Sequence, residues 1–248
     1  MRYRALIFDL FGTLVLFRPK VPTLQVAGTA WRSTMEWMRG QVEHELPEVP
    51  FEAFVRVVMS VTEEIVRARP PEYHEVPSRE RFQRVLVELG LEGPLTEQTA
   101  ERLCRQHMAH LAASTEMPAE HGDVLRRLRA EYQTALVSNF DHGPTAHRIL
   151  AHHGIDELFG ATVISADFGR RKPHPAIFSA ALDQLGIGPD EALFIGDTVV
   201  DDVCGARSVG MDVVWIDAAG EGLPPGSPEP TFAVRRLAEI ETLLGSLA

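Results

Sequence analysis

Short, strongly apolar runs recur along the second half of the chain, and one more stands near its beginning. Charged or turn-forming residues bound each run, a pattern typical of strands that are buried on both faces. The strands predicted in this way occupy residues 4–10, 134–139, 161–165, 192–197, 212–217 and, more weakly, 231–234. Segments between them, such as 122–132 and 174–186, carry apolar residues at helical spacing. Alternation of strand and helix predicts parallel strands joined by crossover helices.

The span from about residue 21 to residue 117 has a different pattern, because apolar residues recur there only at helical spacing and prolines separate the periodic stretches. The predicted helices are residues 24–46, 51–69, 78–90 and 96–114. We therefore expect an α/β fold in which a parallel sheet is flanked by helices and a four-helix cap domain is inserted after the first strand. The core domain would comprise residues 1–17 and 118–248, and the cap domain residues 18–117.

Composition and charge narrow the possible partners of this 248-residue chain. Its net charge of -11 argues against general nucleic-acid binding, which requires clustered Lys and Arg. The sequence has no apolar run near the roughly 20 residues of a membrane-spanning helix, so we expect no membrane partner. The first residues do not resemble a signal peptide, and Cys104 and Cys204 fall in different predicted domains. These features predict a protein of the reducing cytoplasm.

Functional side chains follow four of the predicted strands. Asp9 follows the first, Ser138 and Asn139 end the second, Asp197 ends the fourth, and Lys172 comes a short loop after the third. The carboxyl ends of parallel strands share one edge of a sheet, so we expect these side chains to lie close together. Any one of them alone would more often be a turn or helix-cap residue. The convergence of all four groups indicates a catalytic centre.

Two groups of carboxylates, Asp9 and the segment 196–202 with the sequence GDTVVDD, offer the oxygen ligands that Mg²⁺ prefers. The alternative is an acidic loop in solvent. Asp197, however, directly follows a fully apolar strand, where an uncompensated charge would be costly. A cation would compensate it, and an anionic substrate between the metal and Lys172 would complete the balance of charge.

Four segments together resemble the motifs of the haloacid dehalogenase superfamily, in order and on the expected elements. They are FDLFGTLV at 8–15, VSNFD at 137–141, RRKPHPAIF at 170–178 and IGDTVVDDVCGARSVGM at 195–211. The resemblance implies a Rossmann-like core and identifies the helical insertion as similar to the C1-type cap of that superfamily. It also implies a hydrolase, most often a Mg²⁺-dependent phosphatase that acts on a small phosphorylated metabolite.

The resemblance further implies roles for individual residues. Asp9 would be the nucleophile that forms a covalent aspartyl intermediate. Ser138, together with Asn139, would bind a phosphoryl oxygen, and Lys172 would neutralise the nucleophile and the transferred group.

The same resemblance implies a metal site. Asp9, Asp197 and the backbone carbonyl of Phe11 would bind Mg²⁺, and Asp202, rather than Asp201, would support that set directly or through water.

Phe11 departs from the motif, because phosphatases of this superfamily usually carry aspartate there as general acid and base. Three alternatives follow. The protein is a phosphatase whose leaving group needs little protonation, such as an acyl phosphate, or which takes a proton from His142, His107 or His110. It is a metal-independent 2-haloacid dehalogenase, whose motif also has an aromatic residue at this place, although Asp197 and Asp202 favour the metal. Or it is a weakly active phosphate-binding protein.

Overall fold

The structure is a computed structural model that describes residues 2–17, 22–26, 29–91 and 93–247. The chain separates into two compact units. The first comprises Met1–Phe17, Pro71–His74 and Glu116–Ala248, and the second comprises Arg18–Pro70 and Glu75–Thr115.

A six-stranded parallel sheet forms the centre of the first unit, which confirms the predicted α/β class. In spatial order its strands are β10 (Phe232–Val234), β9 (Asp212–Ile216), β8 (Ala192–Gly196), β1 (Ala5–Phe8), β6 (Gln133–Ser138) and β7 (Ala161–Ile164). The first strand therefore lies between β8 and β6, with Phe8 beside Ile195 on one side and Leu136 on the other. This order brings the ends of three predicted site strands together.

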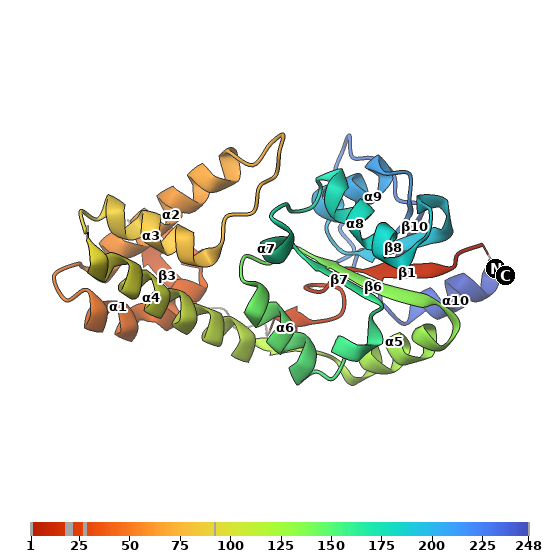
Figure 1. Ribbon diagram of the computed structural model, residues 1–248, viewed down its shortest axis with the longest axis horizontal. Helices are drawn as coiled ribbons and strands as arrows, with labels where there is room; N and C mark the ends of the chain where they lie inside the picture. Colours follow the sequence, from red (N-terminus) through yellow and green to blue (C-terminus); the bar gives the residue numbers. More distant parts are fainter. Residues whose placement is uncertain (1, 18–21, 27–28, 92, 248) are drawn as a thin grey trace. The chain divides into compact units, whose positions relative to one another are not determined.

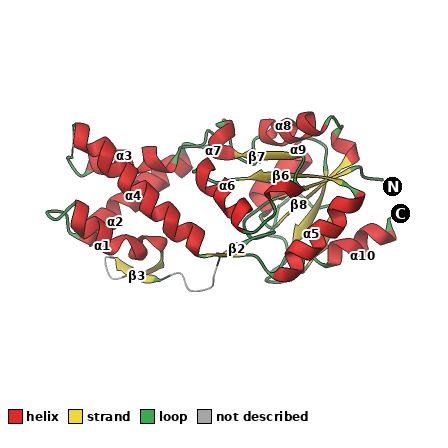
Figure 2. Cartoon of the chain, turned by 60° about the horizontal axis from the view of Figure 1, so that its bottom comes forward, coloured by secondary structure: helices red, strands yellow, loops and turns green. Residues whose placement is uncertain are grey.

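Helices cover both faces of this sheet. In Figures 1 and 2, α8 (Pro175–Leu185) and α9 (Cys204–Ser208) lie on one side, and α5 (Ala119–Glu131), α6 (Gly143–His152) and α10 (Glu239–Ser246) lie on the other. The remaining turns of helix are short: they are η2 (Asp156–Leu158), α7 (Ser165–Phe168), η3 (Pro189–Glu191) and η4 (Val199–Val203). Both faces of the central strands β1 and β8 are thus removed from water, as their unbroken apolar runs predict, whereas the edge strand β10 is partly exposed.

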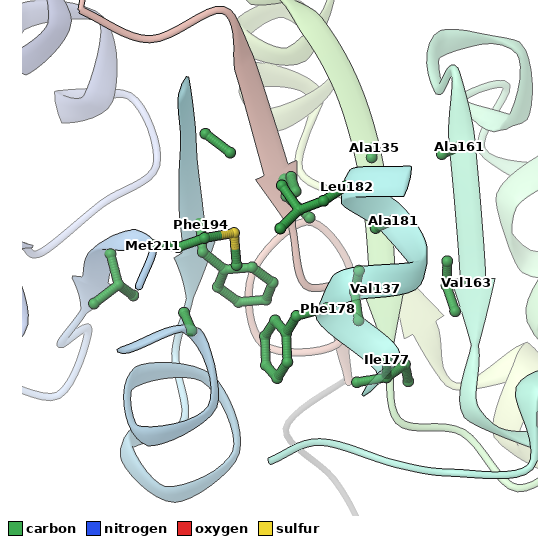
Figure 3. Packing of buried hydrophobic residues seen from close by; sticks show 14 of the residues in the cluster. Ala135, Val137, Ala161, Val163, Ile177, Phe178, Ala181, Leu182, Phe194 and Met211 are labelled. Atoms are coloured by element: carbon green, nitrogen blue, oxygen red, sulfur yellow. The ribbon is translucent and has the colours of Figure 1, made fainter. Parts of the chain in front are cut away.

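The packing between α8 and the sheet shows how the core is filled. Figure 3 shows Phe178 and Leu182 of α8 directed toward the strands, among Val137 and Phe194. The rings of Phe178 and Phe194 meet at 66° with their centroids 5.2 Å apart, a favourable edge-to-face geometry. All four side chains are buried, and this rigid layer supports the strands whose ends carry the candidate site.

The second unit contains α1 (Arg39–Glu45), α2 (Phe51–Arg67), α3 (Ser78–Glu88) and α4 (Pro94–Ala113). The helix predicted over residues 24–46 is wrong in its first half, where β3 (Thr23–Val26) and β4 (Thr29–Arg32) form an antiparallel pair. The β-branched residues of these two strands disfavour a helix there. A 3₁₀ turn, η1 (Thr34–Met38), follows and is capped by the hydroxyl of Ser33.

Two short segments lie where the sequence passes from one unit to the other. Strands β2 (Leu16–Phe17) and β5 (Thr115–Glu116) form a two-stranded sheet. The linker Pro71–His74 between α2 and α3 belongs to the first unit, because the Arg171 amide donates to the Tyr73 carbonyl at 2.9 Å and Arg170 pairs with Glu72 at 2.6 Å. This linker is therefore held against the loop that carries Lys172.

Candidate active site

Asp9 stands at the carboxyl end of the central strand of the first unit. The four residues of β1 are fully buried, and the amide of Asp9 donates to the carbonyl of Ile195 in β8 at 2.9 Å. Its carboxylate is buried too, with only a small part of the residue exposed. The apolar run thus delivers a single charged group to the sheet edge at which parallel α/β folds bind ligands.

Two glycines allow the carboxylates to approach the backbone. Gly12 has φ +88° and any Cβ there would overlap the carboxylate of Asp197. A Cβ on Gly196 would overlap the carboxylate of Asp202 in the same way. Glycine is required at both positions because the acids of β8 and its following turn pack directly against main chain.

Lys172 joins two of these acids. Its ammonium Nζ lies 2.6 Å from Oδ1 of Asp9 and 2.6 Å from Oδ1 of Asp202, and the residue is only 2% exposed. Burial by itself would lower the pKa of Lys172, but the negative charges of Asp202 and Asp9 outweigh it and raise that pKa above its usual range. Lys172 is therefore a permanent cation beside the candidate nucleophile.

Three carboxylates meet beside this lysine. Oxygen atoms of Asp9, Asp197 and Asp202 all lie within 4.8 Å of one another. Burial, with a smaller contribution from the charge of Asp202, raises the pKa of Asp197 to about 6, although Lys172 acts in the opposite direction. Burial likewise raises the pKa of Asp9, against the effect of Lys172. One lysine cannot balance three carboxylates, two of them buried and one partly buried, and an oxygen-only donor set of this kind fits a hard divalent cation such as Mg²⁺.

Asp202 and Asp201 are adjacent in the turn after β8, but their side chains make different contacts. Asp202 is fully buried, and its Oδ2 accepts a hydrogen bond from the Thr198 amide at 2.9 Å. Asp201 instead accepts from Asn139 Nδ2 at 3.1 Å and is not among the three converging carboxylates. The geometry favours Asp202 for the supporting role that the motif resemblance implies.

Ser138, at the carboxyl end of β6, presents an unusual hydroxyl. The residue is fully buried, and its Oγ has no hydrogen-bond partner among the described residues. The hydroxyl of Thr13, in the turn after Asp9, is buried and unpartnered in the same sense. Buried polar groups are nearly always hydrogen-bonded, so these two hydroxyls point to a ligand that is bound at this edge of the sheet.

Asn139 makes contacts that the sequence does not foretell. Its Oδ1 accepts from the amide of Lys172 at 2.7 Å, and its Nδ2 donates to the Lys172 carbonyl and to Asp201, both at 3.1 Å. Both hydrogens of the side-chain amide are therefore engaged. In this arrangement the Asn139 side chain fixes the main chain of Lys172, and the predicted contact of Asn139 with phosphate stays a prediction.

Trp215 is a positioning residue that the sequence reasoning missed. Its indole Nε1 donates to the backbone carbonyl of Asp197 at 2.8 Å, and the side chain is largely buried. Residue 215 pairs with Gly196 across β8 and β9. Pairing of the predicted strands 192–197 and 212–217 could have indicated this role. A residue opposite Gly196 on the adjacent strand can reach the main chain of Asp197.

Phe11, where a carboxylate would be usual, lies in an aromatic stack. Its ring stacks on Phe17 with centroids 5.1 Å apart and planes at 9°, and on Phe140 with centroids 4.9 Å apart and planes at 29°. The three rings come from the segments after β1 and β6, next to Asp9 and Ser138. We refer to Phe11, Phe17 and Phe140 as the phenylalanine stack.

The three histidines considered as substitute acids have other contacts. His142 caps α6, since its Nδ1 accepts from the Thr145 amide at 3.3 Å. In the second unit, Nε2 of His110 lies 3.0 Å from the side-chain amide of Gln106. Nε2 of His107 lies 2.9 Å from the Thr34 hydroxyl, and the ring is buried.

Burial, together with the charge of Arg81 and with His110, lowers the pKa of His107 to about 3. His107 is therefore neutral near pH 7 and is a poor general acid.

The low pKa of His107 predicts acid sensitivity. An unfolded histidine titrates near pH 6.5, so between pH 6.5 and 3 the unfolded chain binds a proton that the folded chain rejects. Stability is then full above pH 6.5 and falls on acidification by about 1.4 kcal/mol per pH unit. We expect His107→Gln to remove this loss in urea unfolding at pH 7 and 5, whereas His110→Gln should retain it. Equal pH dependence in His107→Gln and the unchanged protein would contradict the prediction.

Comparison with known proteins agrees with this geometry. A family model described as haloacid dehalogenase-like hydrolase matches residues 3–210. The glyceraldehyde 3-phosphate phosphatase of Pyrococcus furiosus is 29% identical over 215 residues, which are 86% of this chain and 80% of that protein. Solved structures are also similar in fold, and two of them serve as examples. The 2-haloacid dehalogenase of Pseudomonas syringae has a TM-score of 0.76 at 20% identity and covers 99% of this chain and 100% of its own.

The second solved structure is a HAD-hydrolase of Bacillus subtilis, YfnB, bound to magnesium; its TM-score is 0.64 at 19% identity, over 98% of this chain and 99% of its own. The sheet and the match over most of the chain define a hydrolase of α/β class. The chain belongs to the haloacid dehalogenase-like hydrolases, as the four motifs predict. Among the described helices, none combines the length and the apolar character that crossing a membrane requires.

Proposed function

We propose that the protein is a Mg²⁺-dependent phosphatase that hydrolyses a small phosphorylated metabolite through a covalent phosphate on Asp9, in a cytoplasmic setting. The observation that carries this proposal is the meeting of Asp9, Asp197 and Asp202 within 4.8 Å, beside a lysine bonded to two of them. Phosphatases among the relatives support the choice of phosphate as the group transferred.

In this proposal each residue of the site has a separate role in catalysis, in phosphate binding or in positioning. The carboxylate oxygen of Asp9 attacks phosphorus, and the ammonium of Lys172 lies close enough to stabilise the negative charge that gathers on the transferred group. The unpartnered hydroxyl of Ser138 donates to a phosphoryl oxygen. Asn139 and Trp215 act indirectly: Asn139 positions the main chain of Lys172, and Trp215 positions the main chain of Asp197. The cap, expected from the sequence over residues 18–117, would correspond to the second unit, Arg18–Pro70 and Glu75–Thr115.

Magnesium would be held by Asp9, Asp197 and the carbonyl of Phe11, with Asp202 in support. When bound there, it would reduce the repulsion between an anionic nucleophile and an anionic phosphate. The carboxylates fit this role because they crowd together and, among the ion pairs of the described residues, Lys172 alone pairs with Asp9 and Asp202.

The leaving group must depart without a proton from residue 11, because phenylalanine can neither donate nor accept one. Loss of a positioned acid or base typically lowers the rate by about 10²–10⁴-fold. We therefore place the substrate among phosphates whose leaving group is stable as an anion, such as acyl phosphates.

The test is a panel of acyl phosphates, phosphate esters and 2-haloacids, each assayed with Mg²⁺ and with a chelator. We expect phosphate release from acyl phosphates that falls to background on chelation and returns when Mg²⁺ is restored. The unaffected release of phosphate in chelator would contradict the metal requirement. The absence of phosphate release from every compound would contradict the phosphatase assignment.

A 2-haloacid dehalogenase is the second candidate, and two observations favour it. Phe11 is aromatic, and the fold is similar to that of a 2-haloacid dehalogenase. In that case Asp9 would attack carbon and expel halide without a cation. Halide release that is indifferent to chelator would select this candidate, but the cluster of three carboxylates then has no evident use.

A further inference from the structure

The phenylalanine stack places apolar rings close to the candidate nucleophile Asp9, where phosphatases of this superfamily usually have a carboxylate. Phe11 follows the candidate nucleophile by two residues, and Phe140 follows Ser138 by two. The ring of Phe140 is largely buried, whereas the ring of Phe17 is 41% exposed. Phe11 stacks on both other rings and is half-buried, so Phe17 is the most exposed member of the stack.

Other exposed apolar side chains of the first unit gather at the same edge of the sheet. Its large exposed apolar residues, among those described, are Leu16, Phe17, Phe168 and Val200. All of them lie in segments that follow the carboxyl ends of β1, β7 and β8, the strands that lead to Asp9, Lys172 and Asp197. Of these residues, Phe17 is linked to the segment of Asp9 by its stacking on Phe11. An exposed apolar ring near a buried charged centre is typical of a binding site for a ligand with one charged and one apolar end.

We propose that the leaving group of the substrate is aromatic and that it stacks on the exposed ring of Phe17, as the outer ring of the phenylalanine stack. This inference rests on the proposed phosphatase function and names the substrate class of the same site, aryl or aroyl phosphates. Two independent features support an aromatic leaving group. The apolar rings favour a flat apolar partner, and the lack of an acid at Phe11 favours a leaving group that departs as an anion.

The chemistry balances without a proton donor at residue 11. An Asp9 oxygen forms a bond to phosphorus while the bond from phosphorus to the leaving oxygen breaks, and the bonding electron pair leaves with an arylcarboxylate or phenolate. Water then attacks the phosphorus of the aspartyl phosphate, the bond to the Asp9 oxygen breaks, and the water proton passes to the phosphate released. The net reaction consumes one water and gives dihydrogen phosphate and the arylcarboxylate or phenolate anion.

The decisive comparison is between benzoyl phosphate and acetyl phosphate. Both release carboxylates of similar basicity, so a difference in kcat/KM between them reports recognition of the ring. We expect the purified protein with Mg²⁺ to prefer benzoyl phosphate. Phe17→Ala should lower the ratio of the two kcat/KM values by about 3- to 10-fold, the usual effect of one aromatic stacking contact. The matched control is Phe168→Ala, which removes a similarly exposed ring (38%) that lies outside the stack and should leave the ratio unchanged.

The outcomes separate this inference from the function on which it rests. Equal kcat/KM for the two acyl phosphates, or an equal loss on both in Phe17→Ala, would overturn aromatic recognition while the phosphatase function stands. A decrease of the ratio in Phe168→Ala as large as in Phe17→Ala would also overturn it, because the effect would then not belong to the stack. Failure to release phosphate from either compound would instead refute the proposed function itself.

Discussion

Replacing Phe11 by aspartate is expected to raise the rate at which the protein hydrolyses simple alkyl phosphates by about 10²–10⁴-fold. An alkoxide is a poor leaving group, and the aspartate would supply the proton that phenylalanine cannot. Residue 11 is half-buried next to Gly12, whose missing Cβ already brings Asp197 close, so the new carboxyl would lie in the same site. The measurement is kcat/KM for ethyl phosphate with Mg²⁺ in both proteins.

Phe11→Asn is the matched control for this gain. Both variants lose the two stacked contacts of Phe11 and place a side chain of nearly the same size in the site, but only the aspartate can give up and take back a proton. We expect no gain in Phe11→Asn. An equal gain in the two variants would mean that the removal of a bulky ring, and not acid catalysis, limits the native enzyme.

The part of this site that could be predicted from sequence is the part set by strand periodicity. Apolar runs fix where each strand ends, and parallel pairing then brings Asp9, Ser138 and Asp197 to one edge of the sheet. The structure adds the order of the strands: β1 lies between β8 and β6, so these residues are on neighbouring strands.

Features that depend on the direction of a side chain could not be predicted in this way. The adjacency of Ser138 and Asn139 in sequence suggests a shared role, yet the Asn139 amide turns to the main chain of Lys172 while the Ser138 hydroxyl has no described partner. Trp215 appears in sequence as an ordinary apolar strand residue, and only the pairing with Gly196 brings its indole to Asp197.

The second unit shows where helical periodicity misleads. Residues 24–46 have apolar positions at helical spacing, but a strand pair occupies the first part of that range. Short segments with both β-branched residues and a glycine satisfy either pattern, and tertiary pairing decides between them. Similarly, the linker Pro71–His74 lies in the helical half of the sequence but joins the first unit through hydrogen bonds to Arg170 and Arg171.

Replacement of Asp9 by asparagine is expected to lower phosphate release by about 10⁴–10⁶-fold, the usual effect of removing a nucleophile. The amide has nearly the same shape but cannot form the acyl phosphate. Acid-quenched reactions with radiolabelled substrate should show phosphate bound to the native protein and none bound to Asp9→Asn. The matched control is Asp201→Asn, which removes a charge from the same loop and retains an oxygen acceptor for Asn139. Its activity should fall far less.

The variant Asp9→Asn should also show how the crowded carboxylates affect the free energy of unfolding. Burial raises the pKa of Asp9, which means that the folded protein favours its neutral form, and the ionised form present at higher pH is destabilising. We therefore expect the free energy of unfolding of Asp9→Asn, measured without Mg²⁺ at pH 8, to equal or exceed that of the native protein. A marked loss of stability would show that the ion pair with Lys172 stabilises the fold more than the crowding of carboxylates opposes it. A stable but inactive Asp9→Asn would instead identify this aspartate as a residue retained for chemistry at the expense of stability.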